Sequence, residues 1–205
     1  MLYAKHHFFI YPFFQWYAKF LLRRKFQTVL INGDFIDKRK PVLLIANHVS
    51  WWDGFWAMYL NLKMLKRKFH FMMQEDQLLR YRFFNYTGAF SVNRGSREVL
   101  ESISYAAEIL NHNENMLLMY PQGSLQSIYK SDFVFEKRIE RILTNKTNEI
   151  QIMFSVNLID YLAYRKPTLN IYIKEYKGEC SRKAIQQAYN EFYAACLSTQ
   201  IANAL

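Results

Sequence analysis

Short apolar runs alternate along this chain with longer segments of helical periodicity, and this order constrains the fold more than any other feature. Residues 42–46 (VLLIA) contain no polar side chain, as in a strand buried on both faces. The clearest helical pattern begins at Ser96, and another follows Ser181. Strands are expected at residues 29–31, 42–46, 69–73, 89–92, 116–120, 150–156 and 169–173. This order predicts a single α/β domain with a mostly parallel or mixed sheet of about seven strands flanked by helices.

The composition indicates one folded domain with a basic surface. A chain of 205 residues is long enough for one substantial core and short for two. Its hydrophobic fraction of 51% excludes a disordered chain, and its net charge of +10 suits anionic partners. Cys180 and Cys196 have no metal-ligand spacing, so a reducing compartment and the absence of a metal site are expected.

The N-terminal segment is unusually aromatic. It lacks the roughly 20 uninterrupted apolar residues of a membrane span and the cleavage site of a signal peptide. Gln15, Lys19 and Arg23 recur every four residues and form a narrow polar stripe on an aromatic helix. This pattern predicts an amphipathic helix at a water–lipid interface, and the alternative is a core helix packed on the sheet. The residues expected to contact lipid are Phe13, Trp16, Tyr17, Lys19, Phe20 and Arg23.

The stretch "LLIANHVSWWDGF" at 43–55 places His48 between a strand end and a helix start, with Asp53 five residues later. Two interpretations are open at this point. Ser50 and Asp53 have the spacing of a helix capping box, with Ser50 as the N-cap. Alternatively, the chain turns between His48 and Asp53, and the carboxylate contacts an imidazole nitrogen to form a His–Asp dyad.

Three loops at predicted strand ends carry distinctive chemistry. They are "NHVSWWDG" after the second strand, "NRGS" after the fourth and "YPQGSLQS" after the fifth. Ligands of such sheets bind where loops leave the carboxyl ends of strands, so one shared pocket is expected. The side chains and glycines expected there, besides His48 and Asp53, are Arg94, Gly95, Gln122, Gly123 and Ser124.

These three blocks resemble the signatures of the lysophospholipid acyltransferase family, which includes bacterial 1-acylglycerol-3-phosphate acyltransferases. "NHVSWWDG" is similar to the family's "NHxSxxD", "SVNRGS" to its second block and "YPQGSLQS" to its third, usually written "FPEGTRS". "FEKRIERIL" at 135–143 resembles the basic stretch after the third block. The resemblance implies an acyltransferase domain over residues 27–205, preceded by a membrane-interface segment at residues 1–26.

The resemblance also implies a reaction: transfer of an acyl group from a thioester to a lipid hydroxyl, with His48 as general base and Asp53 fixing the imidazole. Arg94, Gly95, Gln122, Gly123 and Ser124 would bind substrate, and backbone donors near Gly123 are candidates for receiving the developing oxyanion. No cofactor or metal is expected beyond acyl-CoA or acyl carrier protein as co-substrate. The expected location is the cytoplasmic face of a membrane, as a peripheral or monotopic protein.

Two departures from the family pattern concern the acceptor. Gln122 stands where the family usually has Glu, and Leu125 stands where it has Arg. Because these changes remove one acid and one cation, a neutral glycolipid or another hydroxylated lipid competes with lysophosphatidate as the acceptor. Arg94 remains and could hold a phosphate.

A function outside catalysis is the other alternative. A basic, aromatic protein could bind nucleic acid or serve as a non-catalytic membrane module. The basic residues occur in separate short runs at 23–25, 38–40 and 66–68, without a nucleic-acid motif. No nucleic-acid partner is therefore expected.

Overall fold

The computed structural model describes residues 1–93, 99–130 and 132–203, which contain one seven-stranded sheet with strand order β1-β7-β6-β2-β5-β3-β4. All neighbouring strands are parallel except β6 and β7, so the predicted mixed sheet of seven strands is confirmed. β6 and β7 are longer than predicted because their ladder continues beyond the core. The strands are β1 (Thr28–Asn32), β2 (Val42–Ala46), β3 (Lys68–Gln74), β4 (Ala89–Val92), β5 (Asn115–Met119), β6 (Gln151–Asp160) and β7 (Thr168–Tyr176).

Helices connect most of the strands. They are α1 (Ile10–Lys25), α2 (Asp53–Leu60), α3 (Glu75–Arg80), α4 (Val99–Ile109), α5 (Arg138–Asn145) and α6 (Arg182–Ala202). A π-helical turn (Asn61–Leu65) follows α2, and a 3-10 turn (Arg82–Tyr86) follows α3. The helix predicted after Ser181 is confirmed, and the Ser181 hydroxyl accepts from the Ala184 N–H at 3.3 Å. Ser96, the predicted start of the earlier helix, lies outside the described residues.

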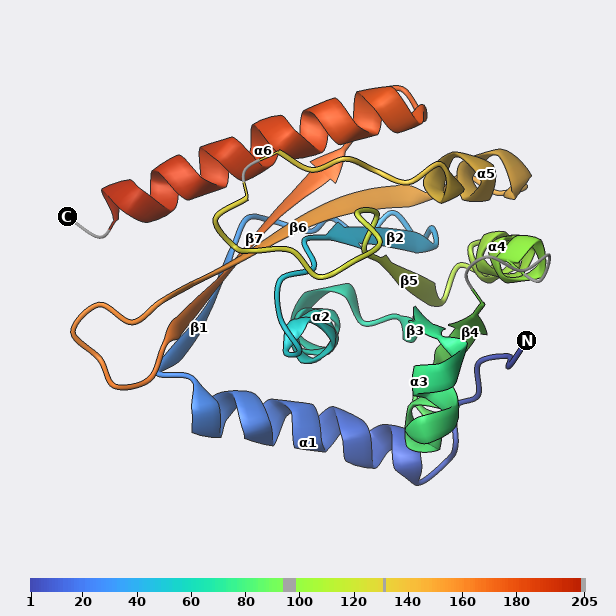
Figure 1. The fold of residues 1–205 in the computed structure, drawn as a ribbon, viewed down its shortest axis with the longest axis horizontal. Helices are drawn as coiled ribbons and strands as arrows, with labels where there is room; N and C mark the ends of the chain where they lie inside the picture. The colour runs from blue at the N-terminus through green and yellow to red at the C-terminus, as the bar shows by residue number, and fades with distance from the viewer. Residues whose placement is uncertain (94–98, 131, 204–205) are drawn as a thin grey trace.

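The sheet is covered on both faces, and the alternation of side chains along β2 divides the core. Leu43 and Ile45 pack with residues of α4, α5 and α6. Val42, Leu44 and Ala46 pack with residues of α1 and α2 on the opposite face (Figure 1). β2 is therefore buried on both sides, as its unbroken apolar sequence predicted.

The first helix, α1, has two different faces. Phe14, Ala18 and Leu22 are buried and belong to the core cluster that includes α2. That face agrees with the core-helix alternative. On the other face, Phe13, Trp16, Tyr17 and Phe20 remain exposed, and their rings stack in pairs along the helix. Contact of this exposed face with lipid remains a prediction. No helix in the described part of the chain combines the length and apolar character needed to cross a bilayer.

Candidate active site

His48 and Asp53 meet just beyond the carboxyl end of β2. His48 lies in the loop after the strand, and Asp53 is the first residue of α2. The His48 Nδ1 and the Asp53 Oδ2 are 2.8 Å apart, and Asp53 is only 1% exposed. The contact is possible because the chain turns between the two residues.

The same Asp53 oxygen also holds the turn. Oδ2 accepts from the backbone N–H groups of Val49 at 2.7 Å and Ser50 at 2.9 Å. One carboxylate oxygen therefore makes both the contact of the dyad and a contact back to the Ser50 N–H. The prediction of Ser50 as N-cap is wrong: Trp52 occupies that position, and the Ser50 hydroxyl instead accepts from the Trp52 N–H at 3.2 Å.

The electrostatics of the pair follow from its burial. Burial raises the pKa of the Asp53 carboxyl, while hydrogen bonds from His48 and from the backbone of Ser50 and Val49 act in the opposite direction. A carboxylate at Nδ1 favours the imidazole tautomer that carries its proton there. The His48 Nε2 is then the nitrogen with a lone pair for accepting a proton.

The loop after β5 supports His48 from two sides. The Tyr120 ring stacks on the imidazole, and the Gln122 Nε2 donates to the His48 backbone carbonyl at 3.0 Å. The backbone N–H of Gln126 donates to the same carbonyl at 2.9 Å. Gln122 is buried, so its position is that of a support for the His48 loop.

The other residues predicted for the site fall in different places. Gly123 lines the cavity described below with a φ of +72°, but its N–H donates to the Tyr120 carbonyl at 3.0 Å. That N–H therefore already has an acceptor within the loop. Ser124 is exposed and does not line the cavity. Arg94 and Gly95 lie outside the described residues.

An apolar cavity of about 530 Å³ opens beside His48 and Tyr120. Its walls come mainly from β3, β5, the start of α2 and the loops that follow β2 and β5. The apolar side chains in its walls include Phe69, Phe71, Met72, Met73, Phe84 and Leu118. Such a space, with one catalytic-type dyad at its edge, can hold a hydrocarbon chain with its reactive end at the imidazole.

Glu136 and Arg138 are site residues that sequence reasoning missed. Both line the cavity, and their carboxylate and guanidinium are 2.6 Å apart. A Cβ at Gly123 would overlap the Glu136 carboxylate, so the glycine permits this close approach. The resemblance of "FEKRIERIL" to a family basic stretch was the signal that could have found them.

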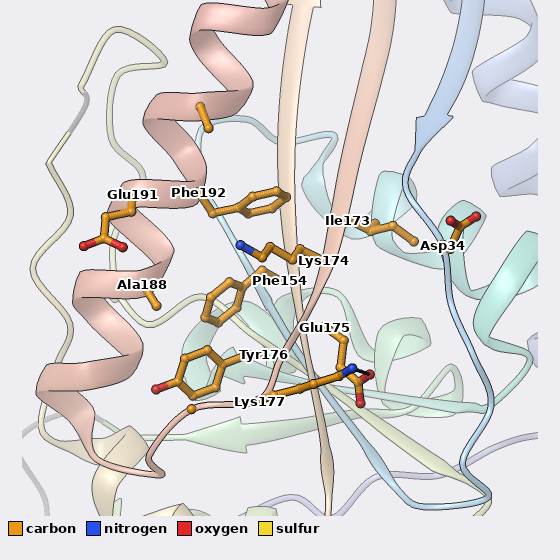
Figure 2. Close-up of a pocket in the computed structure, with 12 residues that line it drawn as sticks. Asp34, Phe154, Ile173, Lys174, Glu175, Tyr176, Lys177, Ala188, Glu191 and Phe192 are labelled. Atoms are coloured by element: carbon orange, nitrogen blue, oxygen red, sulfur yellow. Dashed lines mark ion pairs between the residues drawn. The ribbon is translucent and has the colours of Figure 1, made fainter.

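A second cavity, of about 700 Å³, lies between β7 and α6 (Figure 2). Figure 2 shows Phe154, Tyr176 and Phe192 grouped there, with Lys174 5.8 Å from the Phe192 ring. Tyr176 pairs with Ile152, which pairs with Leu43 near the start of β2. This cavity is larger than the one beside His48, but it lies toward the opposite ends of the strands. None of the predicted site residues lines it.

The described residues contain no group of three His, Cys, Asp or Glu side chains that could hold a metal ion. The Acyltransferase family model matches residues 27–161. The chain belongs to the Acyltransferase family. The family suggested by the three blocks is thus confirmed, and the His–Asp contact lies within the matched region.

Two known proteins are similar to this chain. A curated 1-acyl-sn-glycerol-3-phosphate acyltransferase from Streptococcus pneumoniae is 29% identical over 101 residues, which are 47% of this chain and 36% of the relative. This chain thus matches about a third of that relative's length. The solved 1-acyl-sn-glycerophosphate acyltransferase PlsC from Thermotoga maritima superposes with a TM-score of 0.59 at 16% identity, over 90% of this chain and 78% of that one. The second likeness shows a shared fold.

Proposed function

We propose that this protein is a lipid O-acyltransferase that uses His48 as general base and Asp53 as its orienting partner. The observation that carries the proposal is the 2.8 Å contact of these two side chains at the edge of an apolar cavity, in a chain of the Acyltransferase family. Names of the relatives point to glycerolipid chemistry. No observation favours the nucleic-acid or non-catalytic alternatives.

The proposed reaction needs no covalent acyl-enzyme. The acceptor hydroxyl gives its proton to the His48 Nε2 as its oxygen attacks the thioester carbonyl. The tetrahedral intermediate then collapses, the C–S bond breaks, and the imidazolium returns the proton to the leaving thiolate. Asp53 stabilises the imidazolium between these steps and keeps the ring in the required tautomer.

The acyl chain of the thioester would occupy the apolar cavity. Met72, Met73 and Phe71 line it on β3, and each methylene transferred there from water gains about 0.8 kcal/mol. The thioester carbonyl would then lie at the His48 end. The basic surface suits the phosphates of acyl-CoA and the acidic surface of an acyl carrier protein equally well, so both remain candidate donors.

Two kinds of acceptor lipid, with a neutral or a phosphorylated head group, are candidates. Leu125, which lines the cavity where the family has Arg, favours a neutral glycolipid or another hydroxylated lipid. Arg138, however, brings a guanidinium into the same cavity as His48, oriented by Glu136. This observation favours a phosphorylated acceptor such as a lysophosphatidate, because a guanidinium matches phosphate oxygens bidentately.

We further propose that the protein works as a peripheral enzyme at the cytoplasmic face of a membrane, with the exposed aromatic face of α1 (Phe13, Trp16, Tyr17 and Phe20) in contact with lipid. The thioester co-substrate and the lipid acceptor are the partners that this chemistry requires.

Transfer assays with purified protein test the proposal. The protein is incubated with labelled acyl-CoA or acyl-loaded carrier protein and, separately, with lysophosphatidate, monoacylglycerol or a glycolipid. Products are identified by mass spectrometry. We expect an acylated lipid that forms with the wild-type protein and not with His48→Ala. Absence of any acylated product with every donor and acceptor would overturn the proposal.

A further inference from the structure

The hairpin between β6 and β7 is an arm that extends beyond the core. Its ladder runs from the Ile152–Tyr176 pair to the Asp160–Thr168 pair, and residues 161–166 form the tip. Figure 1 shows this orange hairpin projecting past the start of β1, on the side where the C-terminal end of α1 lies. The tip is closed by a hydrogen bond from the Tyr164 N–H to the Tyr161 carbonyl at 2.8 Å.

The tip presents apolar and basic side chains together. Tyr161, Leu162 and Tyr164 are 55%, 62% and 54% exposed. Leu162 has a φ of +41°, a conformation that costs a non-glycine residue energy. Arg165 and Lys166 follow directly and are both exposed, and neither has an ion-pair partner within the described ranges. An exposed leucine between two tyrosines, followed by two cations, matches the composition of a water–lipid interface.

The base of the tip is joined to the end of α1. The Gln27 N–H donates to the Pro167 carbonyl at 2.9 Å. Gln27 follows the last turn of α1, where Arg23, Arg24 and Lys25 are all exposed. Five cations, three from α1 and two from the tip, therefore belong to two segments that are bonded to each other.

The tip also lies at the end of the sheet where β2 ends and His48 follows. β6 runs parallel to β2, and Ser155 pairs with Ala46, the last residue of β2. β6 continues from there in the same direction to Asp160. At about 3.3 Å per residue, the five residues after Ser155, up to Asp160, extend the arm roughly 16 Å beyond the last residue of β2.

We propose that residues 161–166 are a second membrane contact, which binds an anionic bilayer together with the exposed face of α1. Tyr161, Leu162 and Tyr164 enter the headgroup region, while Arg165 and Lys166 bind lipid phosphates. This interaction goes beyond the proposed acyl transfer. Two separate contacts would hold the protein in one orientation on the membrane. In that orientation the carboxyl end of β2, where His48 lies, would face the lipid surface.

Vesicle flotation with the full chain tests the tip. The vesicles are phosphatidylcholine alone or phosphatidylcholine with phosphatidylglycerol. Tyr161→Ser/Leu162→Ser/Tyr164→Ser should weaken binding to both kinds of vesicle, by roughly tenfold or more. Arg165→Gln/Lys166→Gln should weaken binding to the anionic vesicles by roughly tenfold or more and leave binding to the neutral ones unchanged, because the attraction depends on lipid charge.

Two control variants carry changes of the same kind elsewhere. Ile36→Ser/Leu100→Ser removes apolar side chains that are 74% and 49% exposed. The Ile36 carbonyl accepts from Gln151 at the start of β6, at the opposite edge of the sheet. Arg141→Gln/Lys183→Gln removes the same charge from exposed positions on α5 and α6. Both controls should bind vesicles as the wild type does.

Two results would overturn the proposal. One is wild-type vesicle binding by both tip variants while circular dichroism and melting show that they are folded. The other is a changed oligomeric state in size-exclusion chromatography without a change in vesicle binding, which would indicate that the tip contacts a second protein chain. Absence of acyl transfer would count against the proposed function and leave the vesicle result intact.

Discussion

The Tyr120 ring lies parallel to the His48 imidazole, with ring centroids 4.3 Å apart and an interplanar angle of 13°. Together with the Nδ1 contact to Asp53, this stack fixes the plane of the imidazole and the direction of its Nε2. Burial raises the pKa of the Tyr120 phenol well above its ordinary value, so the ring stays neutral at any working pH. Its hydroxyl is buried without a hydrogen-bond partner among the described residues.

The stack predicts that the ring matters and the hydroxyl does not. Tyr120→Phe should retain kcat within about twofold and should leave the melting temperature unchanged or raised, since it removes a buried unpaired group. Tyr120→Leu should lower kcat by about tenfold or more with a smaller effect on KM, because the imidazole loses its orientation. Steady-state kinetics of the two variants measure this difference, and equal losses in both would contradict it.

The dyad predicts a graded loss. His48→Ala should abolish transfer and leave the fold intact, because it removes the base from a loop position. Asp53→Asn should lower kcat by about 10³ to 10⁴ and cost about 1 kcal/mol of stability, since the amide changes the imidazole tautomer and weakens the turn. Turnover and urea unfolding measure the two effects. Near-normal turnover by His48→Ala would show that another group is the base.

Stability should depend on pH through a buried histidine remote from the dyad. Burial, together with the nearby His6, lowers the pKa of His70 to about 3. The folded state therefore binds fewer protons at His70 than the unfolded state between about pH 6.5 and 3, and stability falls as the pH drops through this window. His70→Gln should remove up to roughly 1.4 kcal/mol per pH unit of that dependence. Urea unfolding at pH 7 and pH 5 checks this, and identical pH dependence in both proteins would refute it.

The exposed face of α1 predicts membrane binding that can be separated from folding. Trp16→Ser/Tyr17→Ser/Phe20→Ser should release the protein from vesicles, since each aromatic ring supplies much of the interfacial burial. Transfer to a short-chain, water-soluble acceptor should survive better than transfer to membrane lipid. Flotation and melting are measured on the same samples. Retained vesicle binding with a lowered melting temperature would favour the core-helix alternative for this face as well.

If Arg138 binds the acceptor phosphate, its loss should be partly compensated by a second cation in the same cavity. Arg138→Met should lower kcat/KM for lysophosphatidate by about tenfold or more and affect a neutral lipid acceptor much less. Adding Leu125→Arg should restore part of the loss, because Leu125 lines the same cavity and the change returns the family's cation to it. Arg141→Met, on the same helix, is the matched control. If Arg138→Met lowers transfer to both acceptors equally, Arg138 has a structural role and the neutral acceptor regains support.

The sequence determined the sheet and the family. Apolar runs located all seven strands because most side chains of strands in a sheet covered on both faces are apolar and turned toward the core. The three blocks identified the family because their residues lie close together in the chain. His48 and Asp53 could also be paired from sequence, since only five residues separate them and a turn between them was the sole requirement.

The tertiary structure decided how the loops meet. Gln122 was expected at the substrate, yet its amide supports a backbone carbonyl 74 residues earlier in the chain. Tyr120 and Arg138 had no assigned role, because their positions at the cavity that His48 lines depend on contacts between distant segments. The two faces of α1 likewise follow from where α2 packs. Periodicity reports which side chains avoid water, but it does not report which distant segment covers them, and that choice is made only when the elements pack.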